Sequence, residues 1–407
     1  KRFYQAPEWS SGRWALRTRH MRALNEGPTS PTSTEIRGAA PLLRGAGESE
    51  DIPLQQRRCA AGSLDKWSGH ATARHWLPGL SLIRLSRPFL YQPLACVTVL
   101  SLLVTFLGAE YGYANLDVAA DISLGVGTPL ALLLAFRLNI SYTRWLEGRT
   151  LWGKLVESSR SIVSTAVSAT LAAQSDGCGG EEARATQERA REVAGWCVAF
   201  AYYLRGRLHD DDPAEATPAV QQLRDALERL LGARAVDELE AARAAGRNVP
   251  LRVLCRLRGS ASRLLRGCGG GGAGPAGSAS ALLASELLVG ARDEELFGTL
   301  SGCERLTSTP TPPGYVAILR SALLAFLVLL PFIVAELGLV EVPVCLLTSL
   351  ILLGIEDVAV QLEVPFGDDE NDLPLAHYCV ALEADLAELL DLLPAPDDGL
   401  AEPPKNA

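Results

Sequence analysis

Four strongly apolar stretches of this chain contain no Asp, Glu, Lys or Arg, and they limit what the chain can fold into more than any other feature. They are residues 88–109, 122–136, 321–335 and 342–355. A helix rises about 1.5 Å per residue, so the first stretch can cross the roughly 30 Å of hydrocarbon in a bilayer. The other three are shorter than the usual span of about 20 residues, and each by itself fits a buried core helix equally well. They fit membrane spans if their polar ends line a water-filled path.

Basic residues flank the first two apolar stretches on one side only. They are Arg74, Arg84 and Arg87 before the first stretch and Arg137, Arg144, Arg149 and Lys154 after the second. The connection between the stretches carries no Lys or Arg and three acidic residues, which are Glu110, Asp117 and Asp121. Because basic loops stay on the inner side of a membrane, the N-terminus and the middle of the chain are predicted to share that side. Four spans would return the C-terminus there as well.

The composition divides the chain into five segments. Residues 1–75 hold no sustained apolar period and are predicted to be a disordered leader, either an organelle transit peptide or an ordinary tail. Residues 76–144 contain the first two membrane helices, and residues 145–314 form an inner-side helical region with Gly/Ala-rich inserts. Residues 315–362 contain the third and fourth membrane helices, and residues 363–407 hold an acidic motif, a helix and the C-terminal tail.

Three local predictions concern polar and apolar faces. The segment after residue 136 should continue as a helix, with Arg137, Arg144 and Arg149 on a solvated side. Residues 196–204 are apolar but short and flanked by arginines, so a buried helix of the inner region is favoured over a span. Glu336 and Glu341 lie in the short turn between the third and fourth stretches and are expected to face water.

Two motifs close the second and the fourth apolar stretches. The first is F-R-L-N-I-S-Y-T-R-W-L-E-G-R at residues 136–149, and the second is P-F-G-D-D-E-N-D-L-P-L at residues 365–375. The pair, in this order and beside these stretches, resembles motifs of the bestrophin family of pentameric anion channels, in its bacterial, plant and algal branch. The matched positions of the first motif are Arg137, Asn139, Ser141, Tyr142, Arg144 and Trp145.

The resemblance implies an all-α membrane protein with four transmembrane helices per subunit, an inner-side helical domain and a homopentamer around one axial pore. It makes residues 122–136 the pore-lining helix and places Thr128, Leu132 and Phe136 at the narrow hydrophobic neck of the family. These positions are four residues apart, so they share one helix face. From the residues alone they fit ordinary packing positions as well. Thr128 is smaller and more polar than the apolar residue usual in the family, which predicts a wider or wetter ring at that level.

The resemblance also implies a function without catalysis: conduction of chloride, and of bicarbonate, through a protein surrounded by membrane lipid. Photosynthetic relatives lie in the thylakoid membrane of the chloroplast, and the Ala-, Arg- and Gly-rich inserts and basic leader suggest the same place for this chain. Two alternatives remain, a membrane-embedded enzyme and a non-conducting structural membrane protein. The sequence disfavours an enzyme because no nucleophile–base pair or metal set accompanies the apolar stretches.

The acidic cluster at residues 368–372 is the type of sequence that binds calcium, which takes six to eight oxygen ligands. It is not an EF-hand, because Leu373 and Cys379 occupy the positions of the required Gly and Glu. The resemblance matches Asp369 and Asp372 to acids of the calcium clasp in animal bestrophins. The favoured interpretation is a solvated turn whose Asp caps the following helix, with no cofactor required.

Other site classes find no support in the sequence. The nine cysteines form no C-x-x-C motif and the five histidines no metal-binding spacing, which argues against zinc or a disulfide framework. No P-loop, dinucleotide-binding fingerprint or nucleophile elbow occurs. The net charge of −9 argues against a nucleic acid as partner.

Overall fold

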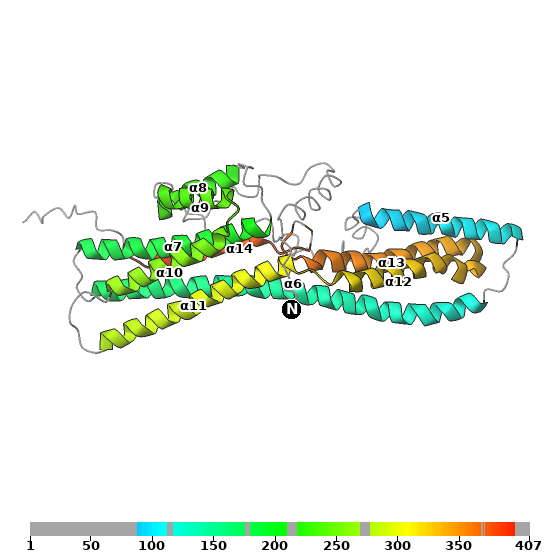
Figure 1. The fold of residues 1–407 in the computed structure, drawn as a ribbon, viewed down its shortest axis with the longest axis horizontal. Helices are drawn as coiled ribbons and strands as arrows, with labels where there is room; N and C mark the ends of the chain where they lie inside the picture. The colour runs from blue at the N-terminus through cyan, green and yellow to red at the C-terminus, as the bar shows by residue number, and fades with distance from the viewer. Residues whose placement is uncertain are drawn as a thin grey trace, which may run out of the picture.

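A computed structural model describes residues 88–111, 117–175, 180–209, 218–268, 277–367, 369 and 371–394. Every regular element within these residues is a helix. The helices lie roughly parallel to one long axis and form two lobes joined end to end (Figure 1). The leader at residues 1–75, the Gly-rich insert at residues 269–276 and the tail beyond residue 394 lie outside the described residues, so the predictions for them stay predictions.

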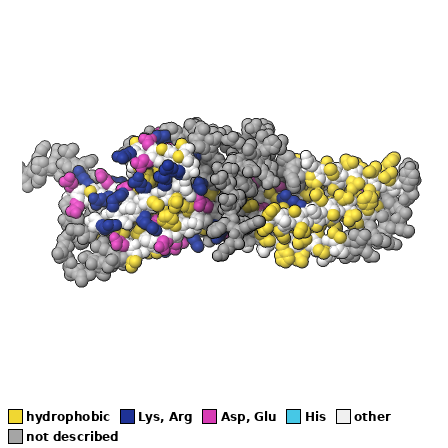
Figure 2. Space-filling model, viewed as in Figure 1, with side chains coloured by type: hydrophobic (Ala, Val, Ile, Leu, Met, Phe, Trp, Pro, Cys, Tyr) yellow, Lys and Arg dark blue, Asp and Glu magenta, His cyan; other side chains and the backbone are white. Residues whose placement is uncertain are grey.

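The first lobe, here the apolar lobe, packs three long helices and a short turn against the beginning of a fourth helix. Its elements are α5 (Pro88–Tyr111), residues 117–144 of α6 (Asp117–Ser175), α12 (Pro313–Ile333), η5 (Ala335–Val340) and α13 (Glu341–Glu363). Its core is aliphatic, with Leu130 and Leu134 of α6 against Leu319, Leu323 and Leu327 of α12. Apolar side chains also cover the outside of this lobe (Figure 2). A soluble surface would not expose so much contiguous apolar area.

Three helical segments are long and apolar enough to cross a membrane. Among the described residues they are Tyr91–Gly108, Pro313–Ile333 and Ala335–Glu363, and only 22%, 28% and 28% of the most apolar 18-residue window of each is buried within the chain. The last two extend beyond the predicted apolar stretches, because α12 takes in Arg320 and α13 takes in Glu356. Residues 122–136 lie in α6 and are not among the three segments, so the count of four spans stays a prediction.

The second lobe, here the polar lobe, is a helical bundle with a charged outer surface (Figure 2). It comprises residues 145–175 of α6, α7 (Gly180–Leu208), α8 (Pro218–Leu231), α9 (Ala233–Ala244), α10 (Val249–Cys268), α11 (Gly277–Ser308) and α14 (Leu375–Leu390). Residues 196–201 and Leu204 are buried in α7, which confirms the prediction of a buried helix there. A Cβ on Gly302 would lie 2.8 Å from Leu151 Cδ2, so glycine permits the close approach of α11 to α6.

The helix α6 joins the two lobes without a break. Its 59 residues span roughly 90 Å at 1.5 Å per residue. The predicted boundary between residues 144 and 145 therefore falls inside a continuous helix, and the prediction that the basic segment continues as helix is confirmed. α6 therefore contributes side chains to the cores of both lobes.

Candidate functional site

One face of α6 in the apolar lobe is turned away from the rest of the chain. Leu132 is 57% exposed, Phe136 is 53% exposed, and Thr128 on the same face is also exposed. Leu130 and Leu134, on the opposite face, are each 2% exposed and lie in the core. The three residues predicted for a neck therefore do not pack in the core of their own chain.

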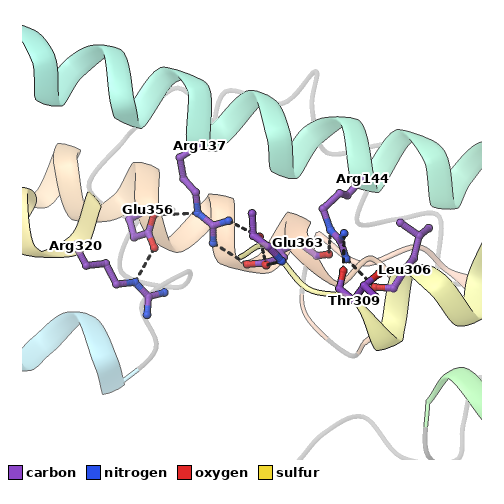
Figure 3. Close-up of polar contacts among 8 residues, drawn as sticks. Arg137, Arg144, Leu306, Thr309, Arg320, Glu356 and Glu363 are labelled. Carbon is purple, nitrogen blue, oxygen red and sulfur yellow. Dashed lines mark hydrogen bonds and ion pairs between the residues drawn. The ribbon is translucent and has the colours of Figure 1, made fainter. Parts of the chain in front are cut away.

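The next residue, Arg137, is fully buried, which corrects the prediction that it is solvated. Its Nη2 donates to Oε2 of Glu363 at 2.7 Å, and its Nη1 donates to Oγ1 of Thr311 at 2.9 Å (Figure 3). Its Nε lies 3.5 Å from Oε2 of Glu356. A buried charge is tolerated only when it is paired and hydrogen-bonded. These three partners supply that compensation, which the amphipathic pattern of α6 could not reveal.

The surroundings of Arg137 form a compact network of two cations and two anions. Arg320 of α12 donates from Nε to Oε1 of Glu356 at 2.9 Å (Figure 3). The backbone N–H of Thr311 donates to Oε1 of Glu363 at 2.7 Å, and its hydroxyl donates to the same oxygen. With Arg137, Arg320, Glu356 and Glu363 all ionised, the network is neutral as a whole. It joins α6, α12 and α13 where the two lobes meet.

Arg144 holds the connection between α11 and α12 against α6. Its Nε donates to the carbonyl of Glu363 at 3.1 Å, its Nη1 to that of Thr309 at 3.0 Å and its Nη2 to that of Leu306 at 2.6 Å. Arg149, five residues on, is exposed as predicted, and its guanidinium carbon lies 4.9 Å from the centre of the Tyr378 ring. Of the three arginines predicted to be solvated, Arg149 is exposed, Arg144 is half-buried and Arg137 is buried.

The remaining residues of the first motif divide between the two faces of α6. Asn139 and Tyr142 are exposed, whereas Ser141 is fully buried. The Tyr142 ring stacks on that of Trp145 with 6.1 Å between centroids. The indole Nε1 of Trp145 donates to the carbonyl of Asn371 at 2.9 Å. Trp145 thus connects the first motif directly to the second.

Asp372 of the acidic turn is buried and bonded within the turn, which corrects two predictions. Asp372 is 1% exposed rather than solvated, and its Oδ2 accepts a bond from the N–H of Asp369 at 2.6 Å. It does not cap the next helix, because α14 has Pro374 at its N-cap and no side-chain cap. No group of three potential metal ligands occurs within the described residues, which exclude Asp368 and Glu370.

The turn is also tied to α13 through amide side chains. Nδ2 of Asn371 donates to Oε1 of Gln361 at 2.8 Å, and Nε2 of Gln361 donates to Oδ2 of Asp357 at 2.8 Å. The N–H of Leu373 donates to the carbonyl of Pro365 at 2.9 Å and closes the turn. Its shape is therefore held by protein groups.

The cysteine thiols in the core of the polar lobe have low reactivity. Burial raises the pKa of Cys197, Cys303 and Cys379 to about 12. The thiolate, not the thiol, is the nucleophile, so these groups are poor candidates for covalent catalysis.

Sequence reasoning missed the partners of Arg137, which are Thr311, Glu356 and Glu363, and the pairing of Arg320 with Glu356. One signal was present. Glu356 and Glu363 are seven residues apart, so they share one face of a helix. Residues 342–355, which precede them in this helix, carry no charge. Ionisable groups in such a segment require a partner of opposite charge.

The two glutamates that were expected to face water, Glu336 and Glu341, differ in their exposure. Glu336 is exposed, as predicted. Glu341 is 0% exposed and accepts a bond from Thr105, so the prediction for it is wrong. The sequence pattern predicted the turn, but it could not predict that α5 packs over the Glu341 side chain.

Comparisons with known proteins agree with this arrangement. A family model described as bacterial/fungal bestrophin protein matches residues 72–388. The voltage-dependent anion channel-forming protein YneE of Escherichia coli (strain K12) is 28% identical over 329 residues, which cover 78% of this chain and 92% of that protein. The voltage-dependent anion channel-forming protein sll1024 of Synechocystis sp. is 29% identical over 270 residues, covering 65% of this chain and 76% of that one.

Solved structures share the fold. The crystal structure of a bacterial bestrophin homolog from Klebsiella pneumoniae is 26% identical, covers 74% of this chain and 97% of its own, and superposes with a TM-score of 0.57. The match of the family model to most of the chain, the two motifs joined through Trp145 and this common fold lead to one conclusion. The chain belongs to the bestrophin family.

Proposed function

We propose that this chain is the subunit of a membrane anion channel whose path runs along the exposed face of α6. The observation that carries the proposal is the outward position of Leu132 and Phe136 beside a buried Arg137 that is ion-paired with Glu363. Two large apolar side chains without a partner in their own chain suit a surface that meets the same surface of other copies around an axis. The names of the relatives, voltage-dependent anion channel-forming proteins, support the same function.

In the proposed channel, Thr128, Leu132 and Phe136 form successive rings of a narrow neck. A hydrophobic ring gates by dewetting, and weakly hydrated anions cross it at lower cost than strongly hydrated ones. Arg137 does not reach this path, because its guanidinium is bound within the neutral network. Selection of anions would then depend on the apolar neck rather than on a ring of fixed positive charge.

The finer points of the proposal follow the family. Five subunits, four spans in each, chloride and bicarbonate as permeant ions, and a thylakoid location are all part of it. Calcium is not a required cofactor in this proposal. Asp369 and Asp372 could contribute carboxylate oxygens to a cation, but the bond between them already holds the turn closed.

Chloride flux into liposomes containing the purified chain tests the function. The proposal expects chloride-dependent flux that increases with the amount of protein. Sealed liposomes with correctly assembled protein and no flux above the lipid background would contradict it. That result would favour a non-conducting structural protein or a membrane-embedded enzyme, the two alternatives from other classes.

A further inference from the structure

A carboxyl group is buried at the end of the apolar lobe that is farthest from the polar lobe. Glu341 is the first residue of α13, directly after η5, and its side chain is 0% exposed. Oγ1 of Thr105 on α5 donates to its Oε2 at 3.0 Å. Its other oxygen, Oε1, is buried and has no hydrogen-bond partner among the described residues. The Arg137 network lies at the opposite end of α13.

Within the part of the chain that the structure describes, no positive charge pairs with this group. Residues 88–136 and 321–376, which include α5, the start of α6, most of α12, η5 and α13, contain no Lys, Arg or His. The titratable group nearest to it on α13 is the buried thiol of Cys345, one turn on. Glu336 of η5 is exposed. The other ionisable residues at this end, Glu110 of α5 and Asp117 and Asp121 of α6, are acidic, and their side chains lie outside the described set.

Small polar residues extend inward from Glu341 along the contact between α5 and α13. Cys345 and Ser349 follow it at four-residue spacing on one face of α13, and Ser101 precedes Thr105 at the same spacing on α5. Cys345, Ser349 and Ser101 are each 0% exposed. The Ser101 hydroxyl lies against the Cys345 thiol, and the Ser349 hydroxyl is buried without a hydrogen-bond partner in the described part of the chain. The contact is thus polar enough to hydrate a charge if the two helices separate.

The energetic consequence concerns the charge state of Glu341. An ionised carboxylate is strongly disfavoured when it is buried with one hydroxyl donor and no cation, whereas the neutral acid loses far less on burial. An ionisable residue within a membrane segment is by default a functional site. We infer that Glu341 is a proton-binding site that is occupied while α5 packs on α13. Release of the proton requires the two helices to part, so the pH on that side of the membrane controls their packing.

Infrared spectroscopy of the purified full chain tests the proton directly and does not depend on ion conduction. At neutral pH the wild-type protein should show the C=O stretch of a protonated carboxyl that is absent from Glu341→Gln. Glu336→Gln, which removes an exposed carboxyl from the adjoining turn, should retain it. If the spectrum of Glu341→Gln retains every protonated-carboxyl band of the wild-type spectrum, the inference is overturned, whether or not the protein conducts anions.

A second variant keeps the test decisive if Glu341→Gln fails to assemble. Thr105→Val removes the donor to Oε2 and keeps the carboxyl, so the band should shift to higher wavenumber. An unchanged band in assembled Thr105→Val overturns the inference.

The control of packing has its own measurement. At alkaline pH, Cys345 of the wild-type protein should react several-fold faster with a small maleimide than Cys345 of Glu341→Gln, and at neutral pH both should be protected. A nearby negative charge disfavours the thiolate, so faster labelling of the wild-type protein cannot come from the ionisation of its thiol and reports access to Cys345. Equal labelling of the two proteins at alkaline pH overturns the proposed control.

Discussion

The buried guanidinium of Arg137 and the half-buried carboxylate of Glu363 form an ion pair, with 2.7 Å between Nη2 and Oε2, one residue beyond the exposed Phe136. Adjacent residues of a helix point about 100° apart, so the pairing of one side chain determines the direction of the other. α6 cannot rotate to hide Phe136 without removing Arg137 from its partners. The pair therefore holds the apolar side chain outward, where the proposed channel needs it.

Loss of the arginine should destabilise the protein strongly. Arg137→Ala leaves the network with one uncompensated negative charge, because Arg320 still pairs with Glu356 but Glu363 keeps only its bonds to Thr311 among the described residues. Breaking a buried pair in this way costs about 3 to 5 kcal/mol. Arg160→Ala is the matched control, because Arg160 is half exposed in its pair with Asp385 and such pairs contribute at most about 1 kcal/mol. Thermal unfolding in detergent should show a large decrease in midpoint for Arg137→Ala only. Equal midpoints for the two variants would contradict the account.

Replacement of Arg144 by lysine should loosen the connection between α11 and α12. One ammonium group cannot reproduce the fork geometry that reaches the carbonyls of Leu306, Thr309 and Glu363. Amide hydrogen exchange at residues 306–312 should be faster in Arg144→Lys than in the wild-type protein. Arg149→Lys, at an exposed position, should leave this exchange unchanged. Unaltered protection in Arg144→Lys would show that the carbonyl bonds do not hold the connection.

Removal of calcium should not abolish anion flux. The acidic turn is held by the bond from the Asp369 N–H to Asp372 and by Trp145, so it has a fixed shape without an ion. Flux into liposomes in chelator should equal flux with calcium added. The contrary result has two parts. Wild-type flux would disappear in chelator and return with calcium, whereas flux through Asp369→Ala/Asp372→Ala would respond to neither. Together these results would show that the turn is a calcium switch.

Site-specific labelling with a thiol reagent should distinguish the cysteines of the polar lobe. Burial raises the pKa of Cys197, Cys303 and Cys379 to about 12, so little thiolate forms at mildly alkaline pH. Cys255 is exposed and should react readily. Mass spectrometry of the labelled, folded protein should find modification at Cys255 and protection at the other three. Equal modification at all four sites would contradict the packing of the bundle.

The helices of this fold are largely predictable from sequence, because hydrophobic period and length are local properties. The first apolar stretch, the continuation of the basic segment as helix and the buried helix around Phe200 all follow from such patterns. The ends of α12 and α13 do not follow from local patterns of this kind. The charges of Arg320 and Glu356 ended the predicted stretches, and the two neutralise each other only in the folded chain.

The errors at the site share a physical cause. Arg137 lies 174 residues before Thr311 and 226 before Glu363, so its burial depends on partners that no local period can identify. Glu341 is covered by Thr105, which precedes it by 236 residues. The face formed by Leu132 and Phe136 was located correctly as one side of a helix, because that is a matter of spacing. Its role in conduction remains a proposal.

Single-channel current through Phe136→Ala tests the central claim most directly, with Phe332→Ala as the matched control. Both residues are exposed phenylalanines of the apolar lobe, at 53% and 40%, but Phe332 lies on α12. If Phe136 forms a ring of the neck, its truncation widens and wets the constriction, so unitary conductance should rise and preference for weakly hydrated anions should fall. Phe332→Ala should match the wild-type protein in both properties. Assembled Phe136→Ala channels with wild-type conductance and selectivity would show that this face of α6 does not line the path.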